Sequence, residues 1–129
     1  MIITLCGSLS FEREINEWNE KLTLAGYTVF SMAVMPSYKE NTKDWYTEEQ
    51  KEILDLVHFS KIEESDAIVV VDPEGYIGKS TEREIKWAIV RDKAVYYTHD
   101  GFPKASMLVQ RQVCRNGSSF LFDEGGVDE

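Results

Sequence analysis

The sequence predicts an α/β domain built on a mostly parallel sheet of four or five strands, and three observations lead to this fold class. Short apolar runs alternate with longer segments in which apolar residues recur every three or four positions. Residues 67–71 are continuously apolar, which is typical of a strand buried on both faces of a parallel sheet. A glycine-containing loop follows that run and leads into a helical pattern. Strands that alternate with helices are joined by right-handed crossovers, so we expect a flavodoxin-like or Rossmann-like three-layer sandwich.

The first part of the chain is expected to contain two strands joined by a helix. The apolar run Ile2–Cys6 predicts the first strand, and residues 27–31 predict the second. Gly26 lies directly before the second strand, at the place where it would end the helix. The helix is predicted from a stripe of apolar residues at helical spacing: Phe11, Ile15, Trp18, Leu22 and Ala25.

The middle of the chain is expected to continue through a loop and a helix into the central strand. Residues 32–46 show no regular pattern and contain three aromatic residues, Tyr38, Trp45 and Tyr46, so we expect a loop over a site. Thr47 and Gln50 form the sequence pattern of a capping box, which predicts the start of a helix. The buried side of this helix is expected to carry Ile53, Leu54, Val57 and Ile62.

The remaining elements are predicted from shorter patterns. A third helix is expected at about residues 81–91 and a fourth strand at Ala94–Tyr97. Residues 103–112 favour a helix, and residues 120–122 favour a short last strand. We therefore expect one domain at residues 1–123 and an acidic, disordered tail at residues 124–129.

Charge and cysteine content limit the classes of function. The net charge of −9 argues against binding to a nucleic-acid polymer, which requires clustered Lys and Arg. Cys6 and Cys114 lie far apart, without the spacing of a disulfide framework or a metal site, which favours a reducing compartment. The sequence shows no signal-peptide pattern and no apolar run of the roughly 20 residues that a membrane span needs. We expect a cytoplasmic protein that acts without a membrane, a metal ion or an organic cofactor.

A ligand site is predicted at the carboxyl ends of the strands, where open parallel sheets bind small molecules. The loop before the third helix is rich in glycine, and backbone N–H groups at a helix start attract anionic groups. Glu84 is expected in the first turn of that helix, where it can be presented to a substrate. The residues expected to line the site are Gly7, Ser8, Asp72, Gly75, Gly78 and Ser80.

Three short motifs occur along the chain in a definite order. They are Leu5-Cys6-Gly7-Ser8 after the first strand, Ser65-Asp66 before the third strand, and Gly78-x-Ser80-x-x-x-Glu84-Ile85 at the third helix. Over residues 1–97 this combination resembles the nucleoside 2-deoxyribosyltransferase superfamily, which includes the 2'-deoxynucleoside 5'-monophosphate N-hydrolases. The resemblance implies cleavage of the N-glycosidic bond of a 2'-deoxynucleoside or its 5'-monophosphate.

The resemblance also implies that Glu84 is the nucleophile that attacks the anomeric carbon of the deoxyribose. A glycine follows the glutamate and its hydrophobic neighbour in the family signature, whereas this sequence has Lys86 there. A covalent glycosyl–glutamate intermediate would then pass the sugar to a second base or to water. Two successive inversions retain the configuration of the sugar.

The proton donor for the departing base stays open. Family members often carry an aspartate about eight residues before the Ser-Asp dipeptide, where this sequence has His58, with Asp55 one turn earlier. A histidine can donate a proton near neutral pH. Asp72 is a second candidate catalytic residue, which could position a sugar hydroxyl or the nucleophile. The N-hydrolases bind the 5'-phosphate with an arginine soon after the first Gly-Ser, and Arg13 lies at a comparable spacing.

Other interpretations of the same residues remain open. Thr81 and Glu84 also match a capping box, in which the glutamate serves only the helix start. His58 can be a packing residue, and Cys6 is expected to be a small buried residue without an activating neighbour in the sequence. The domain could also bind nucleotides as a sensor without turnover, or cleave a related nucleotide such as NAD. A homodimer or higher homo-oligomer is implied by the resemblance, because neighbouring subunits commonly complete active sites in the family.

Overall fold

The computed structural model describes residues 1–33, 35–36 and 46–100, and these residues fold around one parallel sheet. The order of the strands in the sheet is β2-β1-β3-β4, and each pair of neighbours is parallel. This arrangement confirms the predicted α/β class and the four predicted strands. Their bounds are β1 (Ile2–Cys6), β2 (Thr28–Phe30), β3 (Ala67–Val70) and β4 (Ala94–Tyr97).

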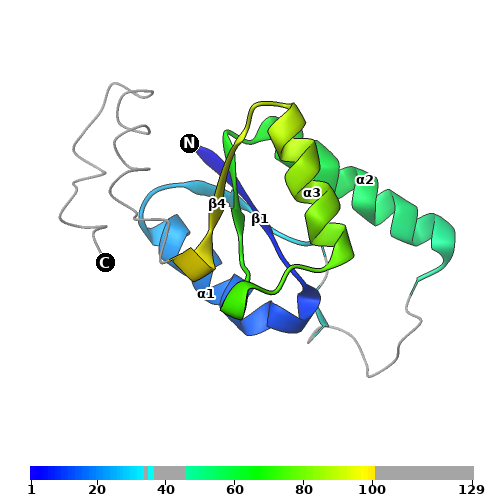
Figure 1. The fold of residues 1–129 in the computed structure, drawn as a ribbon, viewed down its shortest axis with the longest axis horizontal. Helices are drawn as coiled ribbons and strands as arrows, with labels where there is room; N and C mark the ends of the chain where they lie inside the picture. Colours follow the sequence, from blue (N-terminus) through cyan, green and yellow to red (C-terminus); the bar gives the residue numbers. More distant parts are fainter. Residues whose placement is uncertain (34, 37–45, 101–129) are drawn as a thin grey trace.

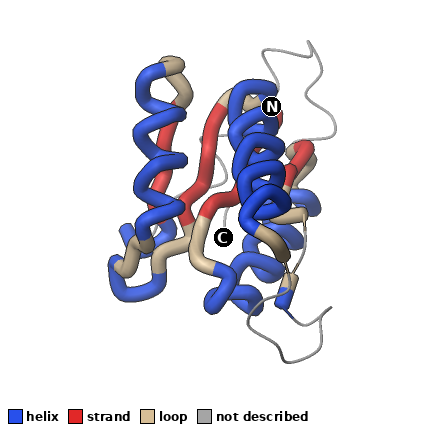
Figure 2. The backbone as a smooth tube through the Cα atoms, turned by 90° about the vertical axis from the view of Figure 1, so that its right-hand side faces the viewer, coloured by secondary structure: helices blue, strands red, loops and turns tan. Residues whose placement is uncertain are grey.

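Helices cover both faces of the sheet and complete three layers. Helices α2 and α3 pack side by side on one face, and α1 packs on the other (Figure 1). In Figure 2 the strands are flanked by these helices. The helices are α1 (Glu12–Leu24), α2 (Glu48–Glu64) and α3 (Lys79–Val90), and three short 3₁₀ turns are η1 (Leu9–Phe11), η3 (Pro73–Gly75) and η4 (Thr98–Asp100).

The central position of β3 explains its continuously apolar sequence. All four of its residues are buried, because helices cover both of its faces. The register pairs Cys6 at the end of β1 with Val70, and it pairs Val70 with Tyr97 at the end of β4. The three strands therefore end together, and the segments that follow them lie along the same edge of the sheet.

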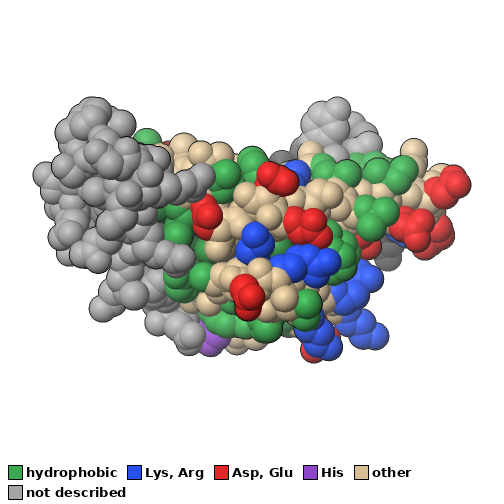
Figure 3. Space-filling model, turned by 90° about the horizontal axis from the view of Figure 1, so that it is seen from above, with side chains coloured by type: hydrophobic (Ala, Val, Ile, Leu, Met, Phe, Trp, Pro, Cys, Tyr) green, Lys and Arg blue, Asp and Glu red, His purple; other side chains and the backbone are tan. Residues whose placement is uncertain are grey.

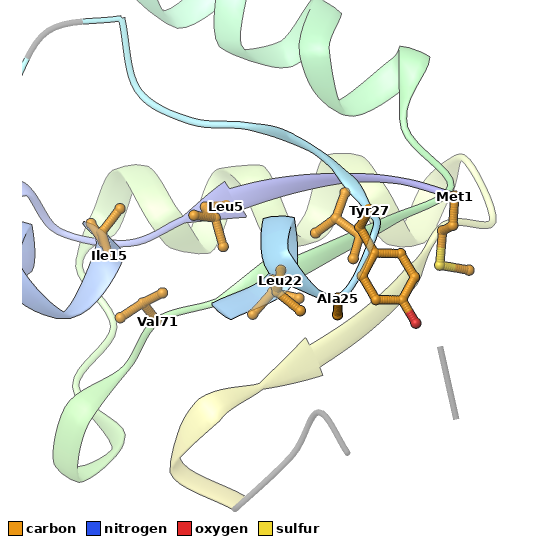
Figure 4. Packing of buried hydrophobic residues seen from close by; sticks show 9 residues of the cluster. Met1, Leu5, Ile15, Leu22, Ala25, Tyr27 and Val71 are labelled. Carbon is orange, nitrogen blue, oxygen red and sulfur yellow. The ribbon is translucent and has the colours of Figure 1, made fainter. Parts of the chain in front are cut away.

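One core forms between α1 and the sheet. Ile15 and Leu22 lie two helical turns apart on the same face of α1, and both are fully buried. Figure 4 shows their side chains among those of Leu5, Tyr27 and Val71. Burying an aliphatic side chain contributes about 1.5–3 kcal/mol, so this stripe holds α1 on the sheet.

The other core forms between the sheet and the pair α2 and α3. Ile62 and Ile85 pack against the opposite face of β3, and the ring of Phe59 stacks on that of Trp87 with centroids 4.5 Å apart. The predicted buried side of α2 is only partly right. Ile62 is buried, but Ile53 and Val57 are 57% and 43% exposed. The buried seam runs instead through His58 and Ile62, one turn apart, because this row faces β1.

The two helix starts compare differently with the sequence predictions. Helix α2 begins with the predicted capping box: Thr47 accepts a hydrogen bond from the Gln50 backbone, and the Gln50 side chain accepts one from the Thr47 backbone. Helix α3 begins at Lys79, two residues earlier than predicted, with Gly78 as its N-cap. Thr81 and Glu84 therefore do not form a capping box at its start, and Glu84 lies beyond the first turn.

Several predictions fall on residues outside the described ranges. These are the helix at residues 103–112, the strand at residues 120–122, the tail at residues 124–129, and the positions of Tyr38, Trp45 and Cys114. In the described part of the chain, no helix combines the length and the apolar character that crossing a membrane requires. On the face seen in Figure 3, acidic, basic and hydrophobic side chains are intermixed.

Candidate active site

A cavity of about 660 Å³ lies at the carboxyl ends of the strands. Its volume falls within the range of about 300–1,000 Å³ that small-molecule sites occupy. It is bounded by the turn after β1, by Met32 and Ala33 after β2, by one side of α2, and by the start of α3. Tyr46, one of the predicted loop aromatics, also lines it. This is the position at which open α/β sheets bind their ligands.

The carboxyl group of Glu84 borders this cavity. Its side chain is 13% exposed, and its Oε1 atom is buried without a hydrogen-bond partner among the described residues. A buried acceptor left unpaired costs about 1–3 kcal/mol, so such atoms call for an explanation. Because the helix starts at Lys79, the carboxylate is not used to cap its own helix. The group is instead turned toward β1 and α2.

Glu84 meets Cys6 from the end of β1 and His58 from α2. The Cys6 Sγ atom lies 3.7 Å from His58 Nε2, and His58 Nε2 lies 3.9 Å from Glu84 Oε1. One ligand atom from each of the three side chains lies within 4.8 Å of the other two. Three elements thus converge on one small polar cluster beside the cavity.

Burial determines the protonation of this cluster. It raises the pKa of Glu84 to about 7; the Cys6 thiol and the Arg83 guanidinium lower that pKa, and the charge of Asp55 raises it. Burial, aided by the charge of Lys61, lowers the pKa of His58 to about 4, against the effect of a hydrogen bond to the Leu5 backbone. The imidazole is therefore neutral at pH 7, while Glu84 is divided between its acid and its carboxylate.

The thiol of Cys6 is also kept neutral. Cys6 is fully buried, and burial together with the neighbouring Glu84 raises its pKa well above the ordinary value. A thiol in this state is a weak nucleophile. The carboxyl group of Glu84 is thus the member of the cluster that can ionise near neutral pH.

Charged side chains surround the mouth of the cavity. Arg83 forms an ion pair with Asp55 at 3.4 Å and a hydrogen bond to Ser80 at 3.3 Å. Lys51 on α2 and Lys79 at the start of α3 also line the cavity. These three basic side chains and the helix start offer favourable contacts to an anionic ligand group.

The structure brings most of the predicted site residues together. Gly7 must approach β3 closely, because a Cβ atom on it would lie 2.8 Å from the carbonyl oxygen of Val71. That contact places the turn after β1 against the end of β3 and next to α3. The predicted residues that line the cavity are Gly7, Ser8, His58, Gly78, Ser80 and Glu84.

Asp72 lies outside the lining of this cavity. Its carboxylate is fully buried and accepts hydrogen bonds from the Thr98 hydroxyl and the His99 backbone, and its Oδ2 pairs with His99 Nδ1 at 2.5 Å. These contacts fasten the end of β3 to η4. Asp72 is therefore not among the residues that line the cavity with Glu84.

Gly75 and Arg13 also lie away from the cavity. Gly75 belongs to the η3 turn, where its φ of +79° favours glycine, and it does not line the cavity. The Arg13 side chain is 87% exposed on the outer face of α1 and pairs with Glu17 at 3.3 Å. Spacing along the sequence placed Arg13 after the first turn, but the orientation of α1 directs it to solvent.

Cys6, Asp55 and Lys51 are among the cavity or cluster residues that were not assigned to the site from the sequence. Cys6 carried one usable signal, since it ends β1 directly before Gly7, at the edge where ligands bind. Asp55 carried another, since it precedes His58 by three residues and shares its side of α2. Lys51 precedes Asp55 by four residues on the same side. Their convergence with Glu84 depends on how α2 packs against α3.

Comparison with known proteins supports the fold. The chain is similar to the solved structure of the CMP N-glycosidase BcmB from Clostridium botulinum, with a TM-score of 0.51 and 17% sequence identity. The similarity covers 75% of this chain and 70% of that chain. At this identity it shows that the two chains share a fold. No protein-family model and no curated protein matches the sequence.

Proposed function

We propose that this protein cleaves the N-glycosidic bond of a 2'-deoxynucleoside or its 5'-monophosphate, with Glu84 as the nucleophile. The observation that carries the proposal is the Glu84 side chain, which borders a cavity of nucleotide-compatible size and whose buried Oε1 atom has no hydrogen-bond partner among the described residues. The fold shared with an N-glycosidase and the sequence motifs around Gly7 and Ser80 support it.

The reaction follows from one carboxylate beside the anomeric carbon. An oxygen of Glu84 forms a bond to C1' while the bond from C1' to the base nitrogen breaks, and its electron pair goes to the base. Water, or a second base, then attacks C1' and releases the carboxylate. The two displacements retain the configuration at C1', as in retaining glycosidases.

Asp55 is the better candidate for the proton donor to the departing base. His58 is neutral at pH 7, because its pKa is lowered to about 4, and its ring faces Cys6 and Glu84. Asp55 lines the cavity, and in its protonated form its carboxyl group can donate to the base nitrogen. Most glycosidases use two carboxyl groups in one active site to cleave the glycosidic bond.

Three basic side chains on the wall of the cavity offer contacts to a 5'-phosphate, although Lys51 is paired with Glu48 and Arg83 with Asp55. Lys51, Lys79 and Arg83 line the cavity, and the start of α3 adds backbone N–H groups. In this proposal these groups bind the 5'-phosphate, which is the role that the sequence analysis gave to Arg13. We expect a monophosphate to have a lower KM than the corresponding nucleoside.

A panel of deoxynucleosides and monophosphates tests the proposal, with free base measured by chromatography. Base release is expected from wild-type protein and from Glu82→Gln, because Glu82 is an exposed carboxylate on the same helix and does not line the cavity. Glu84→Gln should lower the rate by at least about 1,000-fold, since it removes the nucleophile. Binding without base release in the wild type would overturn the enzymatic proposal and favour a nucleotide sensor.

An N7-methylated purine deoxynucleotide tests the role of Asp55. Its base departs without being protonated, so a missing acid matters little for this substrate. Asp55→Asn is expected to lose about 100-fold or more on ordinary substrates, the usual share of general-acid catalysis, and little on the methylated one. An equal loss on both substrates would contradict the assignment of Asp55.

A further inference from the structure

The cluster of Cys6, His58 and Glu84 combines the three ligand types that zinc prefers. Zn²⁺ is bound in proteins by thiolate, imidazole and carboxylate, and sites with three protein ligands keep a fourth position for water or a ligand. The three side chains come from three elements of regular secondary structure, β1, α2 and α3. This cluster therefore differs from an incidental group of surface acids.

The distances suit a tetrahedral ion. Zn–S bonds of about 2.3 Å and Zn–N or Zn–O bonds of about 2.0–2.1 Å separate neighbouring ligand atoms by about 3.3–3.5 Å. The Sγ–Nε2 distance is 3.7 Å and the Nε2–Oε1 distance is 3.9 Å, and all three atoms lie within 4.8 Å. Small rotations of the Glu84 side chain would close the remaining difference.

The surroundings of the cluster also fit a cation. The Oε1 atom of Glu84 is buried without a hydrogen-bond partner among the described residues, so a bound ion would satisfy it. His58 and Glu84 border the cavity, which provides a path from solvent and space for a fourth ligand. Mg²⁺ and Ca²⁺ require more oxygen ligands and have no affinity for a thiol, so they do not suit this set.

We propose that Cys6, His58 and Glu84 form a binding site for Zn²⁺, or for a divalent ion of similar ligand preference, at the wall of the cavity. Binding would release the thiol proton of Cys6 to solvent and form a Zn–thiolate bond. The ion is not needed for the proposed reaction. Where that function holds, the bound ion blocks the nucleophile, so zinc would be a reversible inhibitor.

Cobalt spectroscopy on the full chain tests the site directly. Co²⁺ replaces Zn²⁺ in such sites and gives a thiolate-to-metal absorption band that reports a bound cysteine. The band is expected in wild-type protein under reducing conditions, and added Zn²⁺ but not Mg²⁺ should remove it. It should persist in Cys114→Ser and Glu82→Gln, which leave the cluster intact, and it should be lost in Cys6→Ser.

Glu84→Gln provides a second test that does not depend on how well Cys6→Ser folds. Removal of the carboxylate should weaken Co²⁺ binding by more than about 10-fold, the lower limit seen even for partners outside the ligand shell. The absence of a thiolate band, a band that survives Cys6→Ser, or an unchanged affinity in Glu84→Gln would overturn the site. Base release is measured with EDTA present, so it does not depend on the metal. A failure of the enzymatic proposal can therefore be told apart from a failure of the metal site.

Discussion

At the scale of single residues, the carboxyl group of Glu84 is held in a balance that suits chemistry near neutral pH. Burial disfavours its charged form, while the Cys6 thiol and the Arg83 guanidinium favour it, and the pKa settles at about 7. A carboxylate with both oxygens held in hydrogen bonds or ion pairs would be ionised, but it could not attack C1'. A fully isolated one would stay protonated. Near pH 7, a substantial fraction of the protein therefore carries Glu84 in the ionised form that the proposed mechanism requires.

The pH dependence of base release should show this ionisation. With the N7-methylated substrate, which needs no acid, kcat/KM is expected to rise about tenfold per pH unit below pH 7 and to level off above it. The direction follows because only the ionised Glu84 attacks in the proposed mechanism, and its fraction increases with pH. The measurement is a pH–rate profile between pH 5 and 9 with EDTA present. A rate that is already constant at pH 5 would contradict the raised pKa.

At the scale of elements, the site depends on how closely the turn after β1 approaches β3. The backbone N–H of Val71 donates a hydrogen bond to the Cys6 carbonyl at 2.8 Å, which locks the two strand ends together. Gly7 follows at once and leaves no room for a side chain against the Val71 carbonyl. This contact brings Cys6 and Ser8 to the cluster and the cavity.

Gly7→Ala is expected to destabilise the protein by about 1–3 kcal/mol, the usual cost of overpacking. The added Cβ would lie 2.8 Å from the carbonyl oxygen of Val71, and that oxygen belongs to rigid backbone. Urea unfolding measures the change. Gly78→Ala is the matched control, because its Cβ would meet the Tyr76 hydroxyl at an ordinary 3.6 Å, so its cost should stay below about 1 kcal/mol. Equal costs for both variants would show that Gly7 is not a tight contact.

At the scale of the whole molecule, two buried groups give folding stability opposite dependences on pH. The folded pKa of Glu84 is about 7, above its ordinary 4.5, so its contribution is complete below about pH 4.5 and is lost as the pH rises through 7. The folded pKa of His58 is about 4, below its ordinary 6.5, so its contribution is complete above about pH 6.5 and is lost as the pH falls toward 4. Between about pH 4.5 and 6.5 the two dependences oppose each other and largely cancel, so a variant that removes one of the two groups is needed to see either.

Glu84→Gln should isolate the alkaline side of this profile. At pH 8 the variant is expected to be more stable than the wild type by about 1–3 kcal/mol, because it removes a buried charge, and the difference should vanish near pH 4.5. Urea unfolding of both proteins at the two pH values, with EDTA present, measures it. Glu82→Gln, on the exposed side of α3, should show no such pH dependence. Lower stability of Glu84→Gln at pH 8 would show that the carboxylate is stabilised by partners.

The sequence by itself determined the fold class, the four strands, the start of α2 and the presence of Glu84 at a strand-to-helix crossing. These features depend on local patterns, since the apolar run of β3 and the capping box of Thr47 and Gln50 lie within a few neighbouring residues. The same patterns could not place Arg13 or Asp72, because a spacing along the chain does not say which way a side chain points.

Only the tertiary structure decided which groups surround Glu84. Cys6 and His58 are 52 positions apart, and they meet because α2 crosses the end of β1 next to α3. Burial at that meeting point holds Cys6 neutral and moves the pKa values of Glu84 and His58 toward each other's ordinary range. Burial depends on how all the elements pack together, so no short stretch of the sequence predicts it.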